Sequence, residues 1–389
     1  MILDGFAASS IALGAQRIRA GGLLGLPTET VYGLAADAEN DTAVAQIFTA
    51  KGRPADHPLI VHVRDAVCVG HFAAQVPDFA DRLMQAFWPG PLTLILPRRP
   101  GVASAAAGGQ DTIGLRCPSH PVAQMLLQAL LQNGGQNPTH SESAKPQAKE
   151  LASQPHGVWG IAAPSANQFG RVSPTTAAHV QSEFGPDLLI LDGGACTVGI
   201  ESTIIDCTRG QPVLLRPGAI TREQVQAACG LKVLLKDELA TDAAPAPKAS
   251  GTLESHYAPK ATVRLMDAAA LRAALARWVA DEAAMGPAAG VAVATRARAQ
   301  APALPTIAVY ARSVHPNQSS RLLSQHMPAD ATAAARELFA VLRRLDAQGV
   351  QQIWIETPPA GAEWDGVRDR LQRAASQVGN PSWRDRRQP

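Results

Sequence analysis

Two cations near the start of the chain have the types and spacing needed to hold a phosphate group. Lys51 and Arg53 flank Gly52 at the expected end of a helix. Lysine binds phosphate as a point charge and arginine as a fork of N–H donors. Each charge-assisted hydrogen bond contributes about 1.5–3 kcal/mol, so the pair can hold a triphosphate without a P-loop. The alternative is that both cations only stabilise the helix C-terminus.

A second group of candidates consists of polar residues at places where α/β proteins bind ligands. Three follow apolar runs that are typical of strands, and one precedes a proline at an expected helix start: Thr30, Ser165, Asn167 and Ser173. Polar groups at strand ends and backbone N–H groups at helix starts both suit an anion. Turn and helix-cap roles without any ligand explain the same residues about as well.

Two arginines lie at the ends of apolar runs that are predicted to be strands. Arg116 and Arg216 therefore each need an anionic partner, because an isolated buried charge is too costly to keep. Thr112 lies on the same predicted strand as Arg116, and Ser202 lies just before another strand. His62, taken alone, is more typical of a core histidine than of a ligand.

Several common motifs are absent from the sequence. There is no G-x-x-x-x-G-K-[ST], no strand-to-helix G-x-G-x-x-G, no H-E-x-x-H and no G-x-S-x-G. Five cysteines without a C-x-x-C pair fit neither a disulfide framework nor a structural zinc site. The net charge of +2 argues against a protein that coats nucleic acid. Without a signal-peptide pattern or a membrane-length apolar run, we expect a cytoplasmic protein with no membrane contact.

The elements that must position these residues alternate between helix and strand, which predicts an α/β fold. A length of 389 residues favours two domains. Composition shifts predict a first domain over 1–230, a linker over 231–262 and a smaller α/β domain over 263–389. A segment rich in Gln, Asn and Ser at 133–157 is predicted to be a mobile insertion in the first domain. The Pro/Ala-rich linker is a candidate lid.

The motifs, taken in order, resemble those of one family. They are PTETVYGL, KGRP..HPLIVHV, FWPGPLTL, TIGLRCPSHP, APSAN, GRVSPT, LDGG, GIEST and LRPG. This series is similar to the YrdC-like domain of the threonylcarbamoyl-AMP synthases. HYAPKA at 256–261 resembles the segment that precedes a second domain in the longer members. The resemblance covers nearly the whole chain and is most specific up to Arg216.

The resemblance implies a fold and an activity. The fold would be a YrdC-like twisted open sheet with helices and a basic concave cleft, followed by a Rossmann-like α/β domain. The activity would be the synthesis of L-threonylcarbamoyl-adenylate from L-threonine, bicarbonate or CO₂, and ATP, with release of pyrophosphate. Mg²⁺ would accompany ATP. A tRNA threonylcarbamoyl transferase complex would use the product, and a weak contact of this chain with tRNA is left open.

The resemblance also implies roles for individual residues. The residues expected to bind L-threonine are Thr30, His62, Arg116 and Ser202. Those expected to bind ATP are Lys51, Arg53, His57, Thr112, Ser165, Asn167, Ser173, Arg216 and, in the linker, Tyr257. Lys51 and Arg53 would be the catalytic cations, and no protein metal ligand or general base is assigned. His57 stands where the family usually has asparagine. Tyr257 would close over the nucleotide, or else only anchor the second domain.

Two other interpretations are kept for comparison. The first is a catalytically silent YrdC-like module that binds RNA or a nucleotide. The second is the carbamoyltransferase of hydrogenase maturation, which contains a related domain. That family carries paired C-x-x-C zinc motifs, whereas this chain has none.

Overall fold

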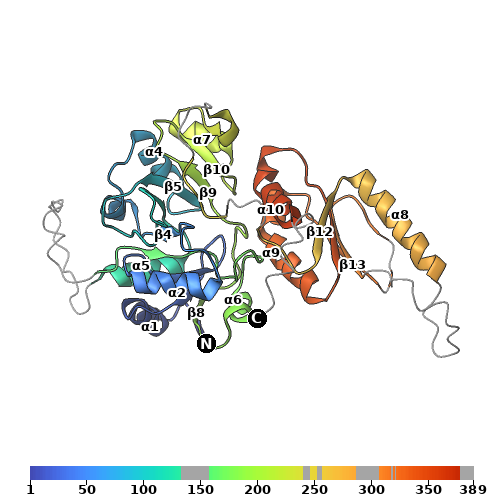
Figure 1. The fold of residues 1–389 in the computed structure, drawn as a ribbon, viewed down its shortest axis with the longest axis horizontal. Helices are drawn as coiled ribbons and strands as arrows, with labels where there is room; N and C mark the ends of the chain where they lie inside the picture. The colour runs from blue at the N-terminus through green and yellow to red at the C-terminus, as the bar shows by residue number, and fades with distance from the viewer. Residues whose placement is uncertain are drawn as a thin grey trace. The chain divides into compact units, whose positions relative to one another are not determined.

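The computed structural model describes most of the chain (Figure 1). The described residues are 1–132, 157–239, 246–251, 256–285, 306–316, 319 and 321–376. The predicted insertion at 133–157 lies outside them except for its last residue. The chain forms two compact units, one of residues 1–169 and 173–253 and one of residues 170–172 and 254–389. No helix among the described residues is long and apolar enough to cross a membrane.

The first unit is built on a mixed sheet. In chain order its strands are β1 (Ile2–Asp4), β2 (Leu24–Leu26), β3 (Gly33–Asp37), β4 (Ile60–His62), β5 (Leu92–Pro97), β6 (Thr112–Arg116), β7 (Ile161–Ala162), β8 (Leu189–Asp192), β9 (Thr203–Asp206), β10 (Val213–Arg216) and β11 (Leu234–Leu235). The sheet is 11-stranded, in the order β1-β8-β2-β3-β7-β4-β6-β5-β9-β10-β11. Neighbours in this order are often distant in sequence, so the sheet brings together motifs that lie far apart in the chain.

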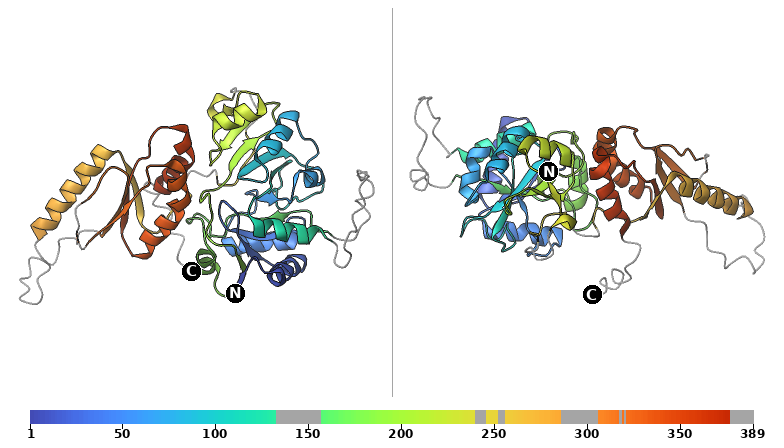
Figure 2. Two further views of the ribbon diagram at one scale, coloured as in Figure 1. Left: turned by 180° about the vertical axis from the view of Figure 1, so that it is seen from behind. Right: turned by 90° about the horizontal axis from the view of Figure 1, so that it is seen from above.

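Helices pack against this sheet (Figure 2) and contribute to two apolar clusters. The helices of the first unit are α1 (Ala8–Arg19), α2 (Asp41–Lys51), α3 (Val69–Phe72), α4 (Asp78–Phe87), α5 (Pro121–Leu131), α6 (Ala177–Phe184) and α7 (Arg222–Cys229). α1 and α5 pack together in one apolar cluster with β2 and β8. α2, α3, α4 and α7 contribute to the larger cluster, which also takes alternate residues of β4, β5 and β6, namely Val61, Leu94 and Leu115.

The other alternate residues of the central strands share the opposite face. His62 pairs with Arg116, Arg116 with Thr93, and Thr93 with Ile204. Successive side chains of a strand point to opposite faces, and paired residues point to the same face. The register therefore gathers one set, which we call the site face: Ile60, His62, Thr93, Ile95, Thr112, Gly114, Arg116, Ile204, Asp206, Val213 and Arg216.

A bulge brings the last of these residues onto the site face. β9 and β10 pair Leu214 with Ile205 but Arg216 with Ile204, so the register shifts by one residue between them. Regular pairing would place Leu215 opposite Ile204 and turn Arg216 toward the other face. The extra residue of the bulge re-aims the arginine.

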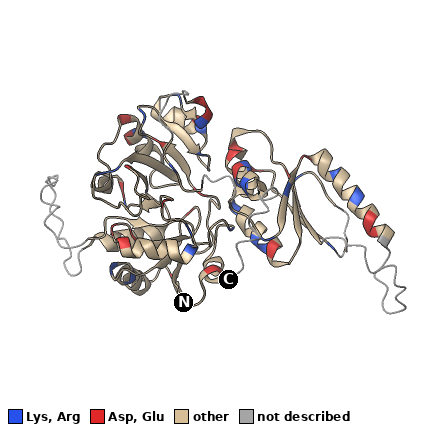
Figure 3. Ribbon diagram, in the orientation of Figure 1, with Lys and Arg blue, Asp and Glu red and all other residues tan. Residues whose placement is uncertain are grey.

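Charged residues are sparse in these central strands. In β4, β5, β6, β9 and β10 they are Arg116, Asp206 and Arg216, whereas several helices, α10 (Asp365–Ala375) among them, carry many Lys, Arg, Asp and Glu residues (Figure 3). Charges on a helix surface are ordinary, but charges inside a sheet require partners. Asp206 has its partner in Arg209, at 2.7 Å, so the two arginines are the charged positions in these strands that call for a functional explanation.

The second unit is a smaller α/β domain, as predicted. Its strands β12 (Thr262–Met266), β13 (Ile307–Ala311), β14 (Leu322–His326) and β15 (Gln352–Glu356) are parallel, in the order β12-β15-β13-β14. Its helices are α8 (Ala268–Met285), α9 (Ala331–Ala347) and α10 (Asp365–Ala375). Leu271 and Leu275 of α8 pack against Val309, while Tyr310, on the other face, donates a hydrogen bond to Glu337 of α9. Helices thus cover both faces of a parallel sheet, as in Rossmann-like folds.

A close backbone approach next to β9 makes a prediction about stability. A Cβ added at Gly218 would lie 2.5 Å from the backbone nitrogen of Thr203 and 2.9 Å from the carbonyl oxygen of Glu201. We expect Gly218→Ala to lower the free energy of unfolding by about 1–3 kcal/mol, because the clash is with backbone that cannot simply rotate away. Gly70→Ala is the matched control, since its Cβ would meet nothing within 4 Å. Equal melting temperatures for the two variants would contradict this account.

Candidate active site

The guanidinium of Arg116 organises one end of the site face. Its side chain is 4% exposed. Nη1 donates to Oγ1 of Thr30 at 2.8 Å, and Nε donates to the carbonyl oxygen of Gly90 at 3.3 Å. Nη2 lies 2.7 Å from Oε1 of Glu29. The loops after β2 and before β5 therefore both close around this one charge.

His62 lies beside Arg116 in the next strand and is buried. Neither ring nitrogen has a hydrogen-bond partner of good geometry among the described residues. Burial, and then the positive charge of Arg116, hold the pKa of His62 well below its usual value of 6.5. His62 is therefore a neutral imidazole at physiological pH.

Ser202 connects the two arginines of the site face. Its hydroxyl lies 2.8 Å from that of Thr93, the residue paired with Arg116. Arg216 donates to the Ser202 carbonyl oxygen from Nε at 3.0 Å and from Nη2 at 2.9 Å, and to its Oγ at 3.0 Å. The structure thus joins residues that the sequence placed in three separate motifs.

Lys51 is the last residue of α2, which ends because Gly52 adopts a φ of 61°. The described hydrogen bonds of the Lys51 ammonium group go to another segment of the chain and not to the carbonyl groups at the end of α2. Nζ instead donates to the backbone carbonyl of Ser165 at 2.6 Å and to that of Asn167. Burial, and then the nearby Arg53, lower the pKa of Lys51 well below 10.5. An anion at this point would therefore favour the charged form of the amine.

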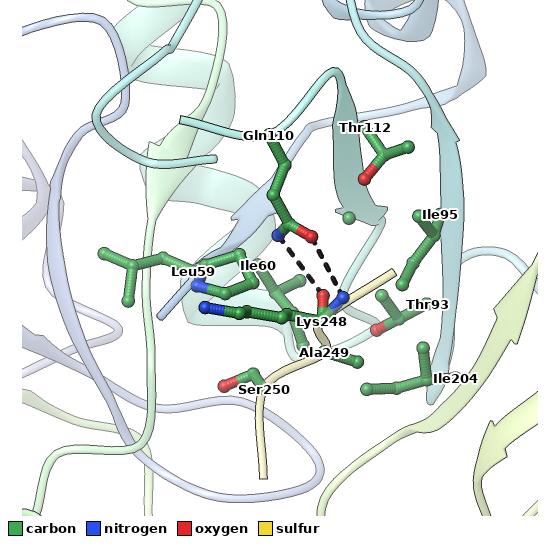
Figure 4. Close-up of a pocket in the computed structure, with 12 residues that line it drawn as sticks. Leu59, Ile60, Thr93, Ile95, Gln110, Thr112, Ile204, Lys248, Ala249 and Ser250 are labelled. Carbon is green, nitrogen blue, oxygen red and sulfur yellow. Dashed lines mark hydrogen bonds between the residues drawn. The ribbon is translucent and has the colours of Figure 1, made fainter. Parts of the chain in front are cut away.

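A short segment before the second unit lies over the site face. Residues 248–250, which we call the strap, line a small pocket together with Ile60, Thr112 and Ile204 (Figure 4). Gln110 accepts from the Lys248 backbone N–H at 2.9 Å, as the dashed lines in Figure 4 indicate.

Both arginines that are predicted to bind ATP contact the strap. Arg216 donates to the carbonyl oxygen of Ser250 at 2.8 Å, and Arg53 lies 3.3 Å from the Ser250 hydroxyl. Thr112 lines the same pocket as Ser250. Arg53 and Arg216, which lie in two different motifs, therefore meet at one residue of the strap.

Ser173 does not begin a helix, contrary to our expectation. α6 begins at Ala177, and the hydroxyl of Thr176 accepts from His179 N as its N-cap. The Ser173 hydroxyl instead donates to Oε1 of Glu201 at 2.5 Å. Ser, Thr and Asn are all good N-caps, so the sequence alone does not distinguish one such residue from another three positions away.

The two remaining predicted ATP-binding residues lie in different surroundings. His57 packs its ring 5.8 Å from that of Phe169, and burial, followed by Arg53, lowers its pKa. Tyr257 lies in the second unit, where its side chain is 1% exposed. Its ring is 5.3 Å from that of Phe339 and 5.6 Å from the guanidinium carbon of Arg370. These contacts describe an anchor of the second unit, and the role of Tyr257 toward ATP stays a prediction.

Sequence reasoning missed two buried carboxylates at the site. Glu29 contacts Arg116, and Glu201 contacts Ser173. Both lie inside motifs that had been singled out, PTETVYGL and GIEST. The signal that could have found them is the need of buried cations for buried counter-charges. Among the described residues, no group of three or more His, Cys, Asp or Glu is placed to hold a metal ion.

The buried imidazole makes a prediction about pH. The folded protein keeps His62 neutral, whereas the unfolded chain takes up a proton below pH 6.5. The unfolded state then binds more protons, so stability falls as pH falls, by up to about 1.4 kcal/mol per pH unit. We expect the melting temperature of His62→Asn to fall less between pH 7.5 and 5.5 than that of the wild type. His57 and His120, whose pKa values are also lowered, are present in both proteins and cancel. Parallel curves would show that His62 is protonated in the folded state.

Comparison with known proteins agrees with this geometry. Residues 16–218 match the Sua5/YciO/YrdC family model, described as telomere recombination, and residues 220–376 match the threonylcarbamoyl-AMP synthase C-terminal domain. The threonylcarbamoyl-AMP synthase of Pyrococcus abyssi (strain GE5 / Orsay) is 40% identical over 258 residues, which cover 66% of this chain and 68% of the relative. That of Schizosaccharomyces pombe (strain 972 / ATCC 24843) is 32% identical over 388 residues, covering 90% and 84%.

A solved structure extends the similarity to both units. The crystal structure of P. abyssi Sua5 complexed with L-threonine matches with a TM-score of 0.76 and 31% identity, covering 96% of this chain and 97% of that one. Both family models, the curated relatives and this structure agree with the motif order in the sequence. The chain is therefore an enzyme of the threonylcarbamoyl-AMP synthase family, in its two-domain form.

Proposed function

We propose that this enzyme makes L-threonylcarbamoyl-adenylate from L-threonine, bicarbonate or CO₂, and ATP, and releases pyrophosphate. The observation that carries the proposal is the group of buried polar atoms around Arg116. Nη2 of Arg116, Oε1 of Glu29 and both ring nitrogens of His62 have no hydrogen-bond partner of good geometry among the described residues. Buried polar groups rarely lack hydrogen-bond partners. A small polar substrate could bond to these neighbouring donors and acceptors.

The Arg116 end of the site face would take the amino acid. A guanidinium pairs with a carboxylate through two N–H donors, so Arg116 would bind the threonine carboxylate. Thr30 already orients the guanidinium through its hydroxyl. His62, which is neutral, and Ser202 would contact the rest of the substrate. The P. abyssi relative, crystallised with L-threonine, supports the same choice of ligand.

The cations would take the triphosphate. Lys51, Arg53 and Arg216 are each buried, at 2%, 9% and 2% exposure, so their charges are little screened by water. The threonine ammonium would lose a proton to solvent, and the free amine would attack CO₂ and lose a second proton to give a carbamate. A carbamate oxygen would then attack the α-phosphorus. The bond to the leaving pyrophosphate then breaks. Such a transfer needs positioning and charge neutralisation, without a covalent nucleophile from the protein.

Mg²⁺ would enter with ATP as part of the substrate. Among the described residues, no cluster of carboxylates is arranged to hold the ion, and Mg²⁺ keeps several waters and binds phosphate oxygens readily. The product, a mixed anhydride, would pass to a tRNA threonylcarbamoyl transferase complex in the cytoplasm. Ser165, Asn167, Ser173, His57, Thr112 and Tyr257 keep their predicted roles at the nucleotide.

The decisive experiment measures pyrophosphate release by the full chain. Release that requires ATP, L-threonine and bicarbonate together supports the proposal. A catalytically silent module that binds RNA or nucleotide would show no release under any of these conditions. Release that is unaffected by omitting L-threonine or bicarbonate would indicate a different nucleotidyl transfer.

The cations yield a quantitative prediction. We expect Lys51→Met and Arg53→Gln each to lower kcat/KM for ATP by about 10- to 100-fold, because each removes a charge-assisted contact of about 1.5–3 kcal/mol. Lys232→Met removes an exposed cation from the same unit and serves as the control. Circular dichroism and melting curves would verify that the variants are folded. Near-wild-type kinetics in both folded variants would refute the phosphate assignment.

A further inference from the structure

Glu29 is a buried carboxylate in the proposed amino-acid site with one oxygen anchored and the other available. The side chain is 7% exposed. Its Oε2 accepts from the backbone N–H of Ser119 at 3.1 Å. Its Oε1 lies 2.7 Å from Nη2 of Arg116, yet neither of these two atoms has a hydrogen-bond partner of good geometry among the described residues. The two charges are adjacent, but the N–H groups of Nη2 are not directed at Oε1.

This geometry differs from that of a simple structural ion pair. A carboxylate that serves only as a counter-ion gains most when its oxygens align with the N–H donors of the fork. Here the loops hold the Arg116 guanidinium and the Glu29 carboxylate side by side, but Nη2 and Oε1 form no well-directed hydrogen bond. Leaving a buried charged group in this condition costs about 1–3 kcal/mol or more, which a ligand can offset by supplying both an acceptor and a donor.

The neighbouring positive and negative charges match an α-amino acid. Its carboxylate and ammonium groups are attached to the same carbon, so their two receptors must lie next to one another. Arg116 supplies a donor for the carboxylate and Glu29 supplies an acceptor for the ammonium. A ligand with only a negative charge would gain from Arg116 but be repelled by Glu29.

We propose that Glu29 binds the α-amino group of the substrate and makes the site selective for amino acids over the corresponding hydroxy acids. The inference rests on the proposed function, because it takes L-threonine as the ligand of this site. It gives Glu29 a substrate-binding role. The nitrogen that it holds is the one that becomes the carbamate, so the contact also positions the nucleophile of the first step.

The test compares two ligands that differ at one position. L-threonine and (2S,3R)-2,3-dihydroxybutanoate, which has a hydroxyl in place of the amine, are titrated calorimetrically into the full chain without ATP. We expect the wild type to bind L-threonine at least about tenfold more tightly, because a charge-assisted contact of 1.5–3 kcal/mol is lost with the hydroxy acid. We expect the ratio to fall to within about threefold in Glu29→Gln.

Several outcomes would overturn the inference. If Glu29→Gln weakens both ligands by the same factor, Glu29 only positions Arg116. An unchanged ratio with unchanged affinities would show that the amine binds elsewhere. Glu29→Asp keeps the charge but withdraws it from the amine, and it is also expected to reduce the ratio, which provides a second variant if glutamine impairs folding. Glu39→Gln, which changes an exposed carboxylate, is the control and should keep the wild-type ratio.

The design separates this inference from the function on which it rests. A wild-type protein that binds L-threonine and releases pyrophosphate, but does not prefer the amino acid, refutes only the role of Glu29. A wild-type protein that fails to bind L-threonine refutes the proposed function and the inference with it. Binding is measured without ATP, so a defect at the cations of the phosphate end does not affect the comparison.

Discussion

The burial of a guanidinium inside the sheet is the constraint around which the first unit is arranged. Arg116 is 4% exposed at the end of β6, between β4 and β5. A charge in that position is tolerated only when partners surround it. Thr30, Gly90 and Glu29 supply them from two loops that are 60 residues apart in sequence. Removing any one of these partners would leave the desolvation of the charge less well offset, so the loops are fixed by electrostatics as well as by turn geometry.

The two faces of the same sheet have different roles: one packs in the hydrophobic core, and the other carries the candidate site residues. One set of alternate side chains in the central strands, including Val61, Leu94 and Leu115, packs against helices in the largest core. The other set carries His62, Arg116 and Arg216. Successive side chains of a strand point to opposite faces of the sheet. A shift of one residue in the register would therefore move the site residues into the core and the core residues onto the site face. The bulge in β10 alters the register between β9 and β10, and it directs Arg216 to the site face.

Candidate residues for the site could be chosen from the sequence, and their roles stay predictions, but their spatial arrangement could not be predicted. Motif order and residue type identified Lys51, Arg53, Arg116, Arg216 and most of the polar candidates, because cations and hydroxyls between apolar runs are conspicuous. The strand order, which joins β4 to β6 and β5 to β9, depends on long-range pairing that local patterns do not encode. Ser173 was misplaced because several residues near it are equally good caps. Glu29 was missed because its significance comes from Arg116, 87 positions away.

The strap gives this enzyme a competitor that is part of its own chain. The carbonyl oxygen of Ser250 accepts a hydrogen bond from Arg216, so a ligand that needs this guanidinium must first displace a backbone group. A tethered competitor has an effective concentration fixed by the length of its tether, and dilution cannot lower it. The apparent affinity is then the intrinsic affinity reduced by the fraction of molecules in which the strap is released. A full-length variant whose strap no longer bonds Arg216 would therefore bind such a ligand more tightly than the wild type, although every binding residue is still present.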